Sequence, residues 1–232
     1  MTITEPTTTA PLRPVAVDLY RDIHKGIRSE LFVVTERAGT LDPSDRADKA
    51  ALAAHVHTVV DLLVSHAEHE DGHIQPALEM HLPALAEQVE ADHERLEARI
   101  ARLAEQASDI VDGTGDPRGK AHRLYVELAA FTSTYLAHQD LEERVIMPSL
   151  EETIGPEAAL AIHQAIVGSI PPEELATSLA IMLPAMNIDD RTELLGGMQA
   201  GAPAEVFQGV WGLTASVLEV RDLEALAARL GL

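Results

Sequence analysis

The stretch His66-Ala-Glu-His-Glu70-Asp-Gly-His-Ile-Gln-Pro76-Ala-Leu78 returns in altered form as His138-Gln-Asp-Leu-Glu142-Glu-Arg-Val-Ile-Met-Pro148-Ser-Leu150. Each copy places a Glu four residues after its first His, a Pro ten residues after it and a Leu twelve residues after it. One His-x-x-x-Glu pair is a weak signal, but two copies with the same trailing Pro and Leu indicate a duplicated functional element. The repeat therefore gives the starting point for the fold.

A further histidine lies well upstream of each copy. His24 comes 42 residues before His66, and His93 comes 45 residues before His138. The chain thus contains two matched sets, each made of one distant His and one His-x-x-x-Glu pair. Two metal ions held between four helices would require this arrangement.

Apolar residues recur every three or four positions in four long segments, which predicts four amphipathic helices. Gly39 and Asp42-Pro43-Ser44 separate the first two segments, and Pro83 suits the first position of the third. Because the connections are short, we expect an all-α protein built on an up-down-up-down four-helix bundle. The expected helices cover residues 15–38, 44–73, 83–112 and 118–147.

The histidines and glutamates of the two sets lie on the apolar faces of these helices. A buried, ionised carboxylate without a partner costs several kcal/mol, so a group of such residues favours a cation between them. Residues four apart share a helix face, and therefore each His-x-x-x-Glu pair can reach one metal centre. Imidazole and carboxylate ligands suit iron, manganese or zinc, and two such sets favour a di-iron or di-manganese site. The predicted ligands are His24, His66, Glu70, His93, His138 and Glu142.

On these residues the chain resembles the hemerythrin-like (HHE cation-binding) proteins over about residues 15–150. The resemblance implies a four-helix bundle around two iron ions, with manganese or zinc as less favoured metals. It assigns one His to the first helix, His-x-x-x-Glu to the second, one His to the third and a His with a carboxylate to the fourth. In the symmetric members, Glu70 and Glu142 would be the bridging carboxylates.

Two positions depart from the oxygen-carrying hemerythrins. Those proteins have a second His four residues after the third-helix His, where this chain has Glu97. They also have an Asp five residues after the fourth-helix His, where this chain has Glu142 at four and Glu143 at five. Additional oxygen ligands stabilise the oxidised metal, which argues against reversible oxygen carriage and favours iron-sensing or peroxide- and nitric oxide-related relatives. Glu97 is either a seventh ligand or a solvated residue beside the apolar face.

The resemblance implies a non-heme di-iron protein that binds or reacts with a small oxidant such as oxygen, peroxide or nitric oxide. The alternatives are a di-iron oxidase or oxygenase acting on an organic substrate, and a module that senses or stores iron or oxygen. Whether the protein is an enzyme depends on which of these holds. Tyr20 and Tyr135, about one turn before His24 and His138, either pack in the core or donate a hydrogen bond beside the metals.

Two other metal motifs lie wholly or partly within the first copy. His69-Glu-Asp-Gly-His73 matches the His-Glu-x-x-His signature of zinc proteases, but Gly72 and Pro76 interrupt the helix there. The ferritin-like Glu-x-x-His pairs that start at Glu70 and Glu90 leave three histidines of the apolar faces unexplained. Both schemes therefore rank below the duplicated set.

The amino-acid composition narrows the possible partners, metal sites and cellular location. The formal charge of −21 repels phosphate backbones and anionic lipid surfaces, so we expect no nucleic-acid or membrane partner. The chain has no Cys, which excludes disulfides, thiolate zinc sites and iron–sulfur clusters. We find neither a signal peptide nor an apolar run of transmembrane length, which predicts a cytoplasmic protein.

The two ends of the chain differ from its centre. Residues 1–14 are rich in Thr and Pro and are predicted to be a disordered tail. Residues 151–232 are predicted to be a helical C-terminal extension, with helices at about 156–168, 171–187, 188–199 and 203–230. This extension is either a lid or a surface for homo-oligomer formation.

Overall fold

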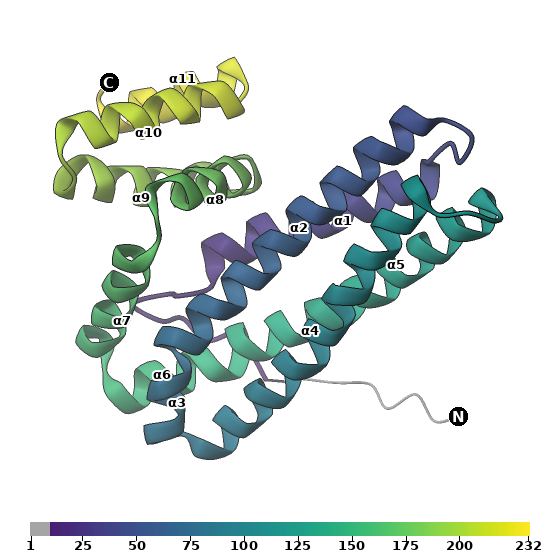
Figure 1. The fold of residues 1–232 in the computed structure, drawn as a ribbon. Helices are drawn as coiled ribbons and strands as arrows, with labels where there is room; N and C mark the ends of the chain where they lie inside the picture. Colours follow the sequence, from purple (N-terminus) through teal and green to yellow (C-terminus); the bar gives the residue numbers. More distant parts are fainter. Residues whose placement is uncertain (1–9) are drawn as a thin grey trace. The chain divides into compact units, whose positions relative to one another are not determined.

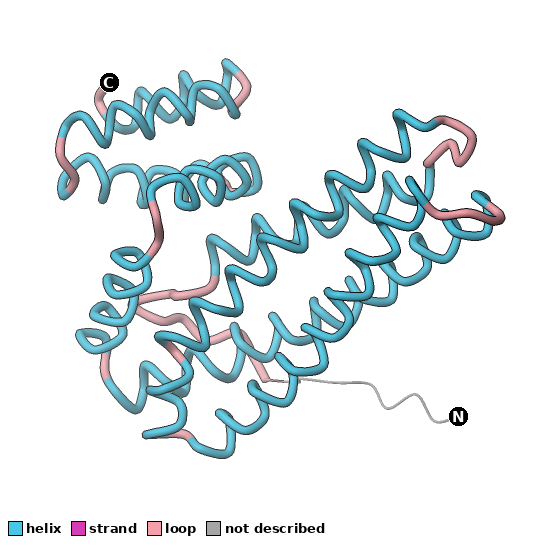
Figure 2. The backbone as a smooth tube through the Cα atoms, viewed as in Figure 1, coloured by secondary structure: helices cyan, strands magenta, loops and turns pink. Residues whose placement is uncertain are grey.

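The computed structural model describes residues 10–232, and within them every regular element is a helix and there is no strand (Figures 1 and 2). The all-α prediction is therefore confirmed. The elements are α1 (Arg21–Thr40), α2 (Arg46–His73), α3 (Gln75–His81), α4 (Pro83–Asp112), α5 (Pro117–Leu141), the π-helix η1 (Glu142–Ile146), α6 (Met147–Ile154), α7 (Pro156–Ser169), α8 (Pro172–Ala185), α9 (Ile188–Gly201), α10 (Ala204–Val217) and α11 (Val220–Leu230).

Contacts divide the chain into two units, Met1–Tyr20 with Glu30–Ser169 and Arg21–Ser29 with Ile170–Leu232. In the first unit, α2 packs against α4 and α4 packs against α5 (Figure 1). The second half of α1 is tied to both neighbours, because Arg37 contacts His55 of α2 at 2.9 Å and Thr35 contacts Thr132 of α5 at 3.2 Å. The apolar faces predicted from the three- and four-residue spacing are the faces that these helices bury.

The first helix begins at Arg21, six residues later than the sequence pattern predicted. The backbone N–H groups of Ala16 and Val17 donate to the carboxylate of Glu151, at 2.9 and 2.8 Å, so this stretch is held in a non-helical conformation. The Asp18 carboxylate accepts from the Tyr20 N–H at 3.1 Å immediately before the helix. Polar contacts with distant Glu151 and with neighbouring Asp18 thus prevail over the periodicity.

The predicted fourth helix also differs, because it is not regular up to residue 147. It is α-helical only to Leu141 and then widens into the π-helix η1, which begins at Glu142. Pro148 has no N–H to donate to the fourth preceding carbonyl, and a π turn relieves that conflict without ending the helix. In the first copy, by contrast, α2 ends at His73 and a separate helix, α3, contains Pro76.

The predicted disordered tail, residues 1–14, lies mostly outside the described residues. Within residues 10–14, Arg144 donates to the carbonyl of Ala10 at 3.2 Å and Arg13 pairs with Glu152 at 3.2 Å. The domain boundaries at 14 and 150 stay predictions.

The second unit has its own small core of buried leucines, Leu179, Leu183, Leu195 and Leu226. Buried Arg191 donates to the carbonyl of Leu183 at 2.7 Å and pairs with Asp222 at 3.0 Å. The single helix predicted over 203–230 is wrong, since the chain breaks at residues 218–219 into α10 and α11. The break lets α11 pack on α9 and bury Leu226.

Helix α2 is long and apolar enough to cross a membrane by length and composition, although the sequence analysis found no such stretch. Its buried face includes Leu52, Val56, Val59 and Leu63, which form part of the core. A core helix meets the same criterion, so this composition is explained by packing against α4.

Candidate metal centre

Four ligand-type side chains meet in the interior of the first unit. Glu70 of α2, His93 of α4, His138 of α5 and Glu142 of η1 each offer an atom, and these atoms all lie within 4.8 Å of one another. The closest contacts join His93 Nε2 to Glu70 Oε2 at 3.3 Å and His138 Nε2 to Glu142 Oε1 at 3.0 Å. Two ligands about 2.1 Å from one ion at a right angle would be about 3 Å apart. The group therefore has the dimensions of a mononuclear coordination shell.

The helices position these four residues by ordinary periodicity. Glu70 lies one turn after His66 near the end of α2, and the two side chains contact at 3.1 Å between Nε2 and Oε1. Glu142 lies one turn after His138 at the point where the π turn begins. All four members of the group are at most 6% exposed.

A second, smaller group within the first unit shares one residue with the first. His66 Nε2 lies 3.1 Å from Glu70 Oε1, so Glu70 contacts an imidazole with each of its two oxygens. His24, on α1, is fully buried and belongs to the second unit, and His66 is 8% exposed. Five of the six residues that the sequence singled out thus lie in the first unit, in two groups that overlap at Glu70.

The electrostatics of the first group favour positive charge. Burial lowers the pKa of His93, but hydrogen bonds with Asp71 and Glu70 outweigh it and raise the pKa to about 10. For His138 the same burial is outweighed by the charge of Glu142 and by Asp92, and its pKa is also raised to about 10. In the absence of a cation, two protonated imidazoles offset the two buried carboxylates; a metal ion can replace those protons.

The two tyrosines flank the carboxylates. Tyr20, just before α1, lines a cavity with Glu70, His93 and Glu142, whereas the ring of Tyr135 lies 5.8 Å from that of His138. Burial, reinforced by the charges of Glu142 and Glu70, raises the pKa of Tyr20 well above its usual value. Burial and the same two charges, Glu70 first, raise the pKa of Tyr135. Both phenols therefore keep their protons and can act as hydrogen-bond donors.

The other candidates lie apart from the two groups. Glu97 is exposed and belongs to neither, although it lines a cavity with His93, His138 and Tyr135. His73 contacts the hydroxyl of Ser169 at 3.0 Å, and Glu90 is exposed. Because the groups found among residues 10–232 include neither His69 nor His73, the protease and ferritin-like schemes gain no support.

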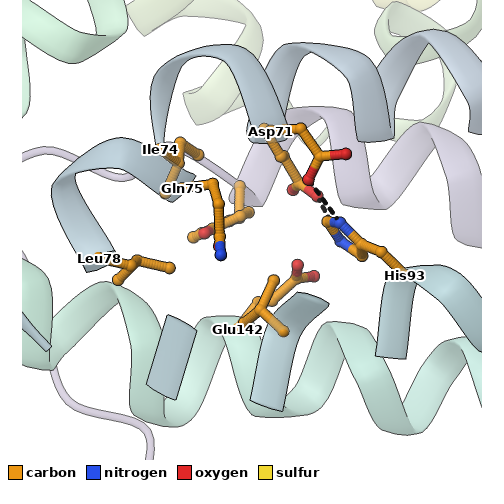
Figure 3. A pocket seen from close by; sticks show the side chains of 9 residues that line it. Asp71, Ile74, Gln75, Leu78, His93 and Glu142 are labelled. Atoms are coloured by element: carbon orange, nitrogen blue, oxygen red, sulfur yellow. Dashed lines mark hydrogen bonds and ion pairs between the residues drawn. The ribbon is translucent and has the colours of Figure 1, made fainter. Parts of the chain in front are cut away.

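Two aspartates beside the ligands were missed by the sequence analysis. Asp71 Oδ1 lies 2.8 Å from His93 Nδ1, and Figure 3 shows these side chains reaching toward each other between their helices. Asp92 Oδ2 lies 3.8 Å from His138 Nδ1, and its interaction with His138 lowers the pKa of the Asp92 carboxyl. The available signal was their position, since each is adjacent in sequence to a predicted ligand.

Comparison with known proteins places the chain in a family. Residues 15–150 match the family model of the hemerythrin HHE cation-binding domain, and this segment is more than half of the chain. A search of curated proteins and a search of solved structures each found no match. The domain described by that family model binds metal cations, and the His/Glu groups provide ligands for one. The chain belongs to the hemerythrin HHE cation-binding family.

Proposed function

We propose that the protein is a non-heme di-iron protein whose centre binds or reacts with a small oxidant such as oxygen, peroxide or nitric oxide. The observation that carries the proposal is the position of Glu70, which belongs to both ligand groups: its Oε1 lies 3.1 Å from His66 and its Oε2 lies 3.3 Å from His93. A carboxylate shared by two groups can bridge two metal ions. The up-down-up-down four-helix bundle is part of the same proposal and is supported by the packing of α2 on α4 and α4 on α5.

The residues fit two iron ions by their chemistry. Every donor is an imidazole or a carboxylate, and the chain has no Cys that would favour a softer metal. Glu142 is 1% exposed and Glu70 is 5% exposed, so their charges require compensation that a cation provides. Manganese and zinc accept similar ligands, and iron is preferred from the family resemblance.

Iron, when bound, would supply the redox chemistry, and the chain would control what reaches it. Leu63, Ala67, Leu96 and Ile100 line the cavity beside His93 and His138, and this apolar lining limits water. Tyr20 and Tyr135 would each hold a proton beside the carboxylates and donate a hydrogen bond there. These residues suit a small, weakly polar oxidant.

The size of the cavities separates a small oxidant from an organic substrate. Side chains nearly fill the two cavities beside the first group, and the larger leaves a volume of only about 10 Å³. Pockets for drug-sized organic molecules measure roughly 300–1,000 Å³. The packing around the ligands therefore favours a diatomic molecule or peroxide over an oxidase or oxygenase substrate. An iron- or oxygen-sensing or storage module remains the second candidate, because the same ligands would serve it.

Metal analysis combined with rapid mixing tests the proposal. Protein produced in iron-replete cells is expected to contain about two irons per chain. The reduced protein is then mixed with oxygen, peroxide or nitric oxide in a stopped-flow spectrometer. Turnover indicates an enzyme, a persistent adduct indicates a sensor or carrier, and inertness in all three mixtures contradicts the proposal. Protein that stays metal-free after reconstitution contradicts it at an earlier step.

The remaining expectations are part of the proposal. We propose a cytoplasmic protein without nucleic-acid or membrane partners. We also propose that residues 151–232 mediate any homo-oligomer, which size-exclusion chromatography with light scattering of the full chain will test.

A further inference from the structure

The ligand imidazoles of the first group each have a carboxylate at both nitrogens. In His93, Nε2 lies 3.3 Å from Glu70 and Nδ1 lies 2.8 Å from Asp71. In His138, Nε2 lies 3.0 Å from Glu142 and Nδ1 lies 3.8 Å from Asp92. The two Nε2 atoms therefore face the ligand group, and the two Nδ1 atoms face a carboxylate outside it.

The outer carboxylates differ from the glutamates of the group. The Asp71 side chain is 48% exposed and the Asp92 side chain is 17% exposed, whereas both glutamate side chains are at most 7% exposed. Asp92 is itself held by an ion pair with Arg95 on the same helix. Among residues 10–232, neither aspartate belongs to a ligand group that could hold a metal. Both are therefore placed to support the imidazoles.

The contacts also cross between helices. Asp71 is on α2 and reaches His93 on α4, while Asp92 is on α4 and reaches His138 on α5. Each aspartate therefore lies beside Nδ1 of a ring that belongs to the neighbouring helix. A ring held at Nδ1 cannot rotate without breaking that contact, so its Nε2 stays directed at the group.

We propose that Asp71 and Asp92 are positioning residues of the metal centre. Asp71 accepts the Nδ1–H of His93, the Asp92 carboxylate attracts the Nδ1–H of His138 across 3.8 Å, and both keep the Nε2 lone pairs directed at one metal ion. This inference rests on the proposed metal-binding function. An imidazole with Nδ1 protonated has its lone pair at Nε2, which is the atom nearest the glutamates. Asp71 is expected to matter more than Asp92, because 2.8 Å is a hydrogen-bond distance and 3.8 Å is not.

The test compares variants of the full chain for their affinity for Co²⁺, measured by calorimetry under anaerobic conditions. Asp71→Ala is expected to weaken binding about 10- to 100-fold, the usual effect of removing an outer carboxylate. Asp71→Asn, whose amide oxygen still accepts the Nδ1–H, is expected to recover part of the loss, and Asp92→Ala is expected to lose less than Asp71→Ala. Asp61→Ala is the matched control, since Asp61 is exposed on α2 and about 15 Å from Asp71 along the helix axis.

A spectroscopic signal separates positioning from a general effect on folding. The visible absorption of bound Co²⁺ reports its coordination geometry, and Asp71→Ala is expected to change it while Asp61→Ala leaves it unaltered. If the Co²⁺ affinities of Asp71→Ala and Asp61→Ala both lie within twofold of the affinity of the unmodified chain, the inference is overturned. An equal loss of affinity in both variants also overturns it. Failure of the unmodified chain to bind Co²⁺ would instead contradict the metal site itself.

Discussion

Replacement of Glu142 by Gln tests the metal centre most directly. Glu142 is 1% exposed, and its Oε1 lies 3.0 Å from His138 Nε2. The amide has nearly the same shape as the carboxylate, so the packing of the helix is retained. The negative charge is lost, and with it an anionic ligand.

The expected loss of affinity follows from Coulomb's law. One negative charge about 2.1 Å from a divalent ion is worth about 4 kcal/mol even at the dielectric constant of bulk water. The amide oxygen restores part of this as a neutral ligand, so we expect Glu142→Gln to weaken binding at least about 100-fold. At metal concentrations well above both dissociation constants, that loss removes about 2.7 kcal/mol of metal-dependent stabilisation.

The assay measures chemical unfolding with excess Mn²⁺ and again with a chelator, for each protein. The difference between the two free energies cancels any effect of the substitution on the metal-free fold. Glu94→Gln is the matched control, because Glu94 is exposed and lies next to His93 on α4. If Glu142→Gln keeps the metal-dependent stabilisation of the unmodified chain, the reasoning from burial and ligand geometry is refuted.

Three further predictions concern Glu97, the histidines and Gln139. Glu97→Gln is expected to leave Mn²⁺ affinity within about threefold, since Glu97 is exposed and outside both ligand groups; a loss comparable to that of Glu142→Gln would make it a seventh ligand. Folding raises the pKa of His93 and His138 from about 6.5 to about 10, so the folded metal-free protein binds more protons in this range and its free energy of unfolding is expected to fall as pH rises through it. Denaturation curves at several pH values in chelator measure that slope, and a free energy that is flat or rises would contradict it. Gln139 is fully buried, and within the described residues neither polar atom of its amide has a hydrogen-bond partner. Gln139→Met is therefore expected to raise the free energy of unfolding by about 1–3 kcal/mol, and a decrease would show that the amide is needed.

The candidate ligands could be predicted from the sequence because ligands and core residues follow the same helical spacing. His93 lies on the buried face of α4 with Val89, Leu96 and Ile100, and a polar residue at such a position is conspicuous. Asp71 and Asp92 lie beside the buried faces, where acidic residues are ordinary. Their contacts depend on how far each helix is rotated toward its neighbour, which no single helix pattern specifies. The start of α1 could not be predicted for a related reason. The contact that holds the preceding stretch in a non-helical conformation is made by Glu151, which is 135 residues from Ala16 in the sequence.

The two copies of the repeat also differ in backbone geometry despite identical spacing in sequence. In the first copy, the Ile74 N–H donates to the Glu70 carbonyl at 2.8 Å, an ordinary four-residue step, and the helix ends. In the second copy, the Met147 N–H donates to the Glu142 carbonyl, a five-residue step, and the helix continues. The two ligand glutamates therefore lie in different local backbone geometry, Glu70 in an α-helical turn and Glu142 in a π-helical turn. Both glutamates contact ligand imidazoles, Glu70 those of His66 and His93 and Glu142 that of His138. A repeat that is nearly symmetric in sequence thus builds two halves that differ in backbone geometry at their ligand glutamates.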